Sequence, residues 1–163
     1  PQDTGDNSRS RRSSGETSNY YKKPPQAHQK AQPKSHHQAK SPNPDLSGAN
    51  FQGVDLKEKD LSGRNLSHAN LSQANLTDAF LHKINLQGAN LYKANLFRAN
   101  LLEANLRNAN LQETNLIGAD LSGADLSGAD LRGAKVGTRD RLLVKLVGTN
   151  LAGAILPDGT IHD

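Results

Sequence analysis

Three regularly spaced carboxylates are the residues of this chain whose types and spacing come nearest to catalytic chemistry. Asp120, Asp125 and Asp130 recur at intervals of five residues, and two carboxylates that converge on one bond can act as general acid and general base. If each five-residue unit occupies one side of a coil, however, the three carboxylates point in different directions. We therefore expect them to support a repeated structure, and we predict that the chain is not an enzyme.

The other candidates for chemistry are weaker. His28, His36 and His37 lie in a Gln-rich stretch without a positioned carboxylate, a setting that rarely holds a metal. The chain has no Cys, which excludes thiol nucleophiles, Cys-based zinc sites and disulfides. No glycine-rich phosphate loop is present, and no Ser, His and Asp lie at a spacing that folding would unite. The sequence predicts no metal, no cofactor and no small-molecule substrate.

Residues 1–44 differ in composition from the rest of the chain. They contain no Leu, Ile, Val, Phe or Met, so burial cannot offset their ordering entropy, and we predict a disordered basic tail or linker. Eight Lys or Arg oppose three Asp or Glu there, against twelve and thirteen in the remainder. Arg9, Arg11 and Arg12, with residues 20–23, could contact nucleic acid or anionic lipid. The thin spread of charge favours a solubilising linker and disfavours a nucleic-acid partner.

The element that would position the three carboxylates is a five-residue repeat. A helix period of 3.6 would carry the repeated residues around the helix, and a strand period of 2 would put them on alternate faces. Each unit must therefore contain a turn, and Gly48 and Gly53 lie where a corner needs free dihedral angles. We predict a continuous coil lined by Ala and Leu. The repeated apolar positions are Leu46, Phe51, Leu56, Leu61, Leu66, Leu71, Leu76, Leu81, Leu86, Leu91, Leu96, Leu101, Leu106, Leu111, Leu116, Leu121, Leu126, Leu131 and Val136.

The stretch from Ala119 to Gly133, three copies of Ala-Asp-Leu followed by two polar or small residues, resembles the pentapeptide-repeat proteins. The resemblance covers about residues 45–136. It implies an all-β fold, a right-handed quadrilateral parallel β-helix in which four units make each coil. The last residues, 151–163, resemble the C-termini of cyanobacterial members, which implies a bacterial and cytoplasmic context.

Two departures from the repeat carry expectations of their own. Lys59 and Arg64 fall at the inward small position, where a long charged side chain does not fit between stacked Ala side chains. We expect an irregular lattice before about Ala69, with the two stems reaching out of the open end. Phe80 replaces the usual Asn or Asp and is expected to interrupt one column of side-chain amides.

Residues 137–163 are predicted to form a C-terminal cap with a short helix and a final repeat. Thr138 suits a helix N-cap and Gly148 is a stop signal. The apolar residues that would share one side of the helix are Leu142, Leu143, Leu146 and Val147. These signals predict a helix over residues 139–147. A degenerate coil is the alternative, because Val144 and Leu146 keep the five-residue phase. No apolar run approaches the roughly 20 residues that a membrane span requires.

Outward positions twenty residues apart should stack on one side of the coil. One such column reads Lys57, Thr77, Phe97 and Ile117. We predict that Phe97 and Ile117 are the centre of a protein-binding patch, because apolar side chains are unusual at outward positions of this repeat. Alternatively they are ordinary exposed apolar residues, or the tail or a second copy covers them. The full patch comprises Tyr92, Lys93, Phe97, Arg98, Leu102 and Ile117.

Three functions compete at this point. The preferred one is a non-catalytic interaction or scaffold module with an unidentified protein partner. Since the chain begins at Pro1, the alternative is a C-terminal regulatory or targeting domain of a larger cyanobacterial enzyme such as a serine/threonine protein kinase. A third function, gyrase interference by DNA mimicry, needs a strongly acidic rod. The near-neutral repeat region, with Lys93, Arg107 and Arg132 outward, disfavours it.

Overall fold

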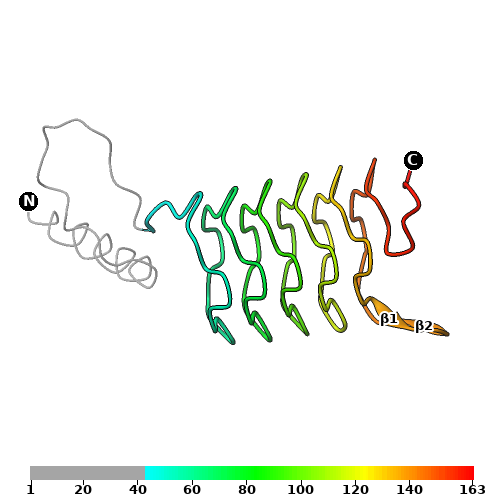
Figure 1. Cartoon of the computed structure of the whole chain (residues 1–163), viewed down its shortest axis with the longest axis horizontal. Helices are drawn as coiled ribbons and strands as arrows, with labels where there is room; N and C mark the ends of the chain where they lie inside the picture. Colours follow the sequence, from blue (N-terminus) through cyan, green and yellow to red (C-terminus); the bar gives the residue numbers. More distant parts are fainter. Residues whose placement is uncertain (1–42) are drawn as a thin grey trace, which may run out of the picture. The chain divides into compact units, whose positions relative to one another are not determined.

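Residues twenty apart pair with one another along most of residues 43–163, which are the residues that the computed structural model describes. Parallel bridges join Asn50 to Asn70, Asp55 to Asn75 and each following unit in turn, as far as Asn115 and Lys135. Each unit contributes one paired residue, so four units complete one coil. The result is a right-handed parallel β-helix whose coils stack side by side (Figure 1). The predicted fold is confirmed in this respect.

Each corner of the coil is built the same way. In the unit that begins at Asn70, the Asn70 Oδ1 atom accepts the backbone N–H of Ser72 at 3.1 Å, and Ala74 N donates to Leu71 O at 3.0 Å. These two bonds close a turn whose last polar residue, Gln73, has a φ of 61°. Within residues 43–163, ten non-glycine residues share this left-handed conformation, with φ between 56° and 61°. The repeated hydrogen bonds therefore hold a backbone conformation that side chains normally disfavour.

The core is a stack of Leu and Ala layers. Every repeated Leu from Leu66 to Leu126 is at most 1% exposed, because each has a coil on both sides. In the first coil Leu46, Phe51, Leu56 and Leu61 are partly buried, since one side of their layer has no neighbour. Burying one Leu contributes roughly 1.5–3 kcal/mol, so the interior coils supply most of the stabilisation.

The expected irregularity before Ala69 is wrong. The bridges from Asp60 to Phe80 and from Asn65 to Asn85 keep the usual spacing, and Leu61 N donates to Phe80 O at 2.9 Å. Lys59 is exposed and Arg64 is partly exposed. The first coil has an open end, so both charged side chains avoid the core without disturbing the backbone.

The helix predicted over residues 139–147 is also wrong. Two short antiparallel strands, β1 (Gly137–Thr138) and β2 (Arg141–Leu142), form a hairpin there, with Gly137 opposite Leu142 and Thr138 opposite Arg141. An isolated nine-residue helix is marginal in water, whereas the extended backbone gains hydrogen bonds from the preceding coil. The apolar residues that were expected on one side of the helix lie in different surroundings: Leu142 lies in the hairpin, Leu146 is partly buried against the core and Val147 is 76% exposed.

After the hairpin the coil continues with one unit looped out. Asp120 pairs with Lys145, Asp125 with Asn150 and Asp130 with Ile155, a spacing of 25 residues instead of 20. Leu143 N donates to Val136 O at 2.8 Å and closes the base of the hairpin. The five-residue phase continues after the hairpin. Val144 and Leu146 keep this phase, as the alternative of a degenerate coil predicted. Figure 1 shows β1 and β2 projecting away from the stacked coils.

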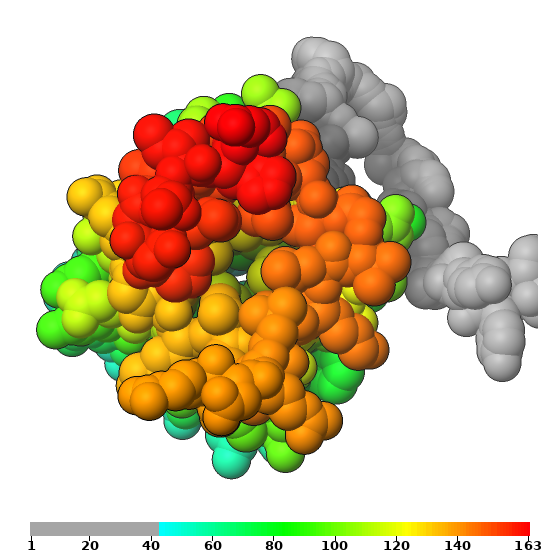
Figure 2. Space-filling model, turned by 90° about the vertical axis from the view of Figure 1, so that its right-hand side faces the viewer, coloured from blue at the N-terminus to red at the C-terminus, as the bar shows by residue number. Residues whose placement is uncertain are grey.

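The chain closes part of its own C-terminal end. Ile161 pairs antiparallel with Ile155, and His162 N donates to Ala154 O at 2.8 Å. Figure 2 looks onto this end, where the hairpin region and the last residues surround a hollow. The hollow is an apolar cavity of about 120 Å³, and Leu142 of the hairpin lines it together with Leu116 and Val136. Residues 43–163 include no helix long and apolar enough to cross a membrane.

Candidate protein-binding face

The three carboxylates of the repeat lie on three different sides of the coil, and each is paired with its own cation. Asp120 lies 3.4 Å from Lys145 Nζ and Asp125 lies 3.3 Å from Arg107 Nη1, while Asp130 binds Arg132. Each also accepts the backbone N–H two residues further on. They serve the lattice, and no group of three His, Asp or Glu within residues 43–163 could hold a metal ion.

These contacts keep the carboxylates charged. The Ser122 hydrogen bonds and the nearby Lys145 lower the pKa of Asp120 below its usual 3.8. Hydrogen bonds from Arg132 lower the pKa of Asp130 in the same way. A general acid at neutral pH needs a raised pKa, so both groups depart in the direction opposite to the one that such catalysis requires. His28, His36, His37 and the basic residues near Arg9 lie outside the described residues.

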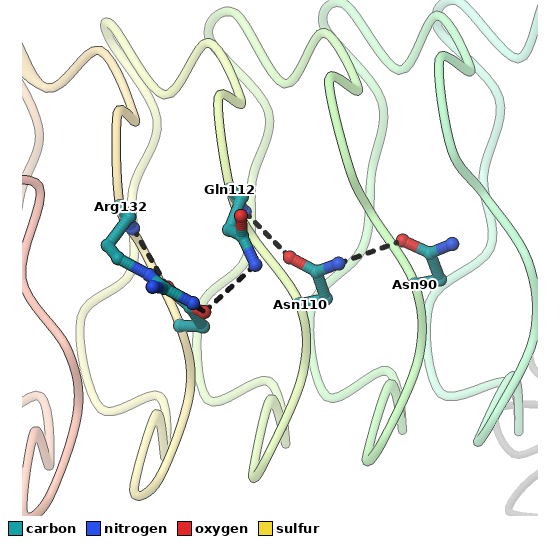
Figure 3. Close-up of polar contacts among 5 residues, drawn as sticks. Asn90, Asn110, Gln112 and Arg132 are labelled. Carbon is teal, nitrogen blue, oxygen red and sulfur yellow. Dashed lines mark hydrogen bonds and ion pairs between the residues drawn. The ribbon is translucent and has the colours of Figure 1, made fainter.

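Most polar side chains next to the bridges are also used by the lattice. Asn110 Nδ2 donates to Asn90 Oδ1 at 3.4 Å, and Gln112 N donates to Asn110 Oδ1 at 3.0 Å (Figure 3). Gln112 Nε2 then donates to Asp130 Oδ2 at 2.9 Å. The inward residues fill the core, and the polar side chains next to the bridges link neighbouring coils by hydrogen bonds. The outward residues of the corners are therefore the positions left for recognition.

Phe97 and Ile117 lie on neighbouring coils, where Arg98 N donates to Ile117 O at 3.0 Å. Both side chains are partly exposed. The Arg98 guanidinium lies over the Phe97 ring, 5.2 Å from its centroid. It also makes two hydrogen bonds to Asp78, of 2.8 and 2.9 Å, which lower the pKa of Asp78. Arg98 is thus held from both sides, by an ion pair and by an aromatic ring.

Tyr92 and Lys93 lie on the preceding side of the same coil. The Tyr92 hydroxyl donates to Glu113 Oε1 at 2.9 Å, and Lys93 Nζ lies 5.3 Å from the centre of the Tyr92 ring. Leu102, 37% exposed, lies on the side that follows Phe97. The six predicted residues therefore form a band over three successive sides of the coil, with Phe97, Arg98 and Ile117 in the middle.

A groove between Tyr92 and Phe97 was missed by the sequence reasoning. It has a volume of about 430 Å³ and runs across three coils. Its lining includes Lys135, which occupies a position where the three preceding coils have Asn75, Asn95 and Asn115. Reading that column every twenty residues would have revealed the change from amide to cation. The lining residues are Lys93, Ala94, Asn95, Glu113, Asn115, Gly133 and Lys135.

Comparison with known proteins agrees with this architecture. The family model described as pentapeptide repeats matches residues 45–82, 65–101 and 99–136, in eight copies. No curated protein sequence matches the chain.

Among solved structures, the pentapeptide repeat protein Rfr23 from the cyanobacterium Cyanothece 51142 is 33% identical, with a TM-score of 0.66. The match covers 73% of this chain and 91% of Rfr23. A pentapeptide repeat protein of the Arabidopsis thaliana thylakoid lumen is 30% identical over 69% of this chain and 72% of its own, with a TM-score of 0.45. HetL, involved in heterocyst differentiation regulation in Nostoc sp. strain PCC 7120, is 26% identical over 72% of this chain and 87% of its own, with a TM-score of 0.36.

Proposed function

Because the chain belongs to the pentapeptide-repeat family, we propose that it is a non-catalytic module that binds a protein partner through the outward face around Phe97 and Ile117. The carboxylates of the repeat are engaged in structural contacts, which leaves no group free to act on a substrate at these positions. A rigid stack of coils suits this role, because side chains that are already in place lose little entropy on binding.

The observation that carries the proposal is the arrangement of Arg98. Its guanidinium is held by Asp78 and lies over the ring of Phe97, beside Ile117. An apolar centre next to an ordered arginine is the composition that dominates binding energy in protein interfaces. Tyr92, Lys93 and Leu102 extend the face to the two neighbouring sides of the coil.

A cytoplasmic location belongs to the same proposal and rests on the resemblance of residues 151–163 to cyanobacterial members.

The surface charge disfavours the alternative of DNA mimicry. A mimic of the phosphate backbone presents a continuous acidic surface, whereas Lys93 and Arg98 lie on this face and Arg139 and Arg141 lie in the hairpin. Whether the module belongs to a larger enzyme, such as a protein kinase, is a separate proposal that the binding face neither requires nor opposes.

The proposal is tested by quantitative capture of proteins from a cyanobacterial lysate, with the full chain as bait. The test variant is Phe97→Asp with Ile117→Asp, and the matched control is Ser67→Asp with Gln87→Asp, two outward positions of consecutive coils on another side. We expect a partner that the native and control chains retain and the test variant loses. Circular dichroism verifies that all three are folded. Identical sets of proteins on the native and test baits would refute the proposed face.

A further inference from the structure

We propose that the groove between Tyr92 and Phe97, together with the hairpin above it, binds an acidic and extended segment of the partner protein. This inference rests on the proposed function, and it assigns the chemical class of the ligand and the residues that select it. Its starting point is the distribution of cations over residues 43–163.

Four cations of these residues are engaged in ion pairs with aspartates of the repeat: Arg98, Arg107, Arg132 and Lys145. Of the other cations, Lys57, Lys59, Arg64 and Lys83 are spread over the earlier coils, whereas four gather at the groove and the hairpin. Lys93 and Lys135 line the groove, and Arg139 and Arg141 lie in the hairpin. Within residues 43–163, none of these four has an ion-pair partner. Lys93 lies over the Tyr92 ring, but an aromatic ring does not neutralise its charge, so all four charges are available to a ligand.

The hairpin rises from the side of the coil next to the groove, in line with Phe97 and Ile117, because Gly137 follows Ile117 by twenty residues. It begins two residues after Lys135, and at its base Gly118 N donates to Leu143 O at 2.6 Å, directly after Ile117. The two arginines consequently extend the row of cations beyond the C-terminal end of the groove. The acidic side chains on this surface are Glu113, which accepts the Tyr92 hydroxyl, and Asp140 in the hairpin turn. Positive charge exceeds negative charge along the whole row.

The spacing of the lysines fits an extended peptide. Lys93 and Lys135 lie two coils apart, which is about 10 Å at roughly 4.8 Å per coil. An extended chain rises about 3.3 Å per residue and turns alternate side chains to the same face. Acidic residues at alternate positions of a strand therefore lie about 7 or 13 Å apart, within reach of two flexible lysine stems. Phe97 and Ile117 do not line the groove. They lie on the next side of the coil, where they would receive neighbouring side chains of the peptide.

The same geometry disfavours a nucleic acid in the groove. Glu113 lies in the middle of the lining, where it would repel an unbroken row of phosphates. A protein binds a phosphate backbone by neutralising many phosphate charges, and the groove itself offers only two lysines for this. A peptide can place an uncharged residue opposite Glu113, whereas a phosphate backbone carries a charge at every step.

The test measures the affinity of the full chain for a fluorescent peptide in which glutamate alternates with valine. The same peptide with glutamine in place of glutamate is the comparison ligand, and anisotropy reports binding. The variants are Lys93→Glu and Lys135→Asn, the second of which restores the amide found in the preceding coils. Lys83→Glu is the matched control, because Lys83 has the same left-handed turn conformation as Lys93, with φ of 59° at each, but lies on another side.

We expect tighter binding of the glutamate peptide than of the glutamine peptide, with about a tenfold loss in each groove variant and no loss in Lys83→Glu. The basic residues 1–44 are the same in every variant, so any binding that they contribute is an equal background for the groove variants and for Lys83→Glu, and the loss in the groove variants relative to this control is the decisive comparison. Equal affinity for both peptides, or an equal loss in Lys83→Glu, would overturn the inference. So would displacement of the peptide by duplex DNA at a comparable concentration of charge.

Failure of this inference is distinguishable from failure of the proposed function. If Phe97→Asp with Ile117→Asp loses the captured partner while the lysine variants keep both partner and peptide, the binding face stands and the acidic ligand is wrong. If the lysine variants lose the peptide while the Phe97 and Ile117 variant keeps the partner, the groove binds acidic peptides and the proposed face is wrong.

Discussion

The stacked coils and the C-terminal region follow the same five-residue phase, yet they use it differently. In the coils each unit pairs with the unit twenty residues away, and a repeated Leu such as Leu96 is fully buried. In the C-terminal region one unit leaves the coil as a hairpin, and Leu142 and Val147 are 58% and 76% exposed. The phase decides which residues face inward, but pairing with the previous coil decides which unit remains in the stack. The stabilising burial is thus concentrated in the coils. The surface departs from the repeat in the region that follows them.

The largest effect should come from a core residue in the middle of the stack. Leu96→Ala removes a buried side chain with coils on both sides and should lower the free energy of unfolding by about 3 kcal/mol. Leu151→Ala, at a partly buried position of the last coil, should lower it by about 1 kcal/mol. Urea denaturation of the full chain measures both. Equal losses would show that the two regions do not differ in packing.

Deletion of the looped-out unit tests the hairpin directly. Removal of residues 138–142 joins Gly137 to Leu143 and restores a spacing of twenty residues between Asp120 and Lys145. We expect a folded protein that loses no more than about 1–2 kcal/mol, because Leu143 then takes a left-handed turn position. Removal of residues 139–142 shifts the phase by one and should unfold the last coil. Circular dichroism and urea denaturation separate the outcomes, and equal damage from both deletions would contradict the assignment of the hairpin.

Acid should weaken the lattice through its aspartates. The pKa values of Asp120 and Asp130 are lowered from 3.8 in the folded protein, so the unfolded chain binds protons first as the pH falls. The contribution of these two aspartates to the unfolding free energy is complete above about pH 5. It is lost as the pH falls through their pKa values in the folded protein. Asp120→Asn with Asp130→Asn should flatten the dependence of the urea midpoint on pH below about pH 5. An unchanged profile would mean that these groups titrate alike in both states.

The smallest effect on stability should come from the ion pair of the binding face. Asp78→Asn removes one partner of Arg98, and because Arg98 is exposed and Asp78 is partly exposed the unfolding free energy should change little. Retention of the partner should nevertheless fall, since Arg98 loses the contact that orients it. Capture and urea denaturation of the same variant measure the two effects. A large loss of stability with unchanged capture would make the pair structural.

Prediction from the sequence succeeded for features that the pattern within one five-residue unit determines. The inward position of Leu96, the use of Asp120 by the lattice and the length of one coil follow from local spacing and from the resemblance to a repeat family. It failed in expecting an irregular lattice around Lys59 and Arg64, because the sequence does not show that the two side chains can leave the open end without disturbing the backbone pairing. It missed Lys135 in the groove, since that groove joins residues from three coils.

The sequence pattern alone determined the inward face and the turn in each unit, because these depend on a pattern repeated within five residues. The stacking of residues twenty apart came from the resemblance to the repeat family. Tertiary structure alone decided that residues 137–142 leave the coil as a hairpin and that Arg98 is held between Asp78 and Phe97. It also decided that Lys93 and Lys135 face one groove. The physical reason is that each of these features depends on hydrogen bonds or packing between neighbouring coils, and a single unit carries no information about which residue lies next to it in space.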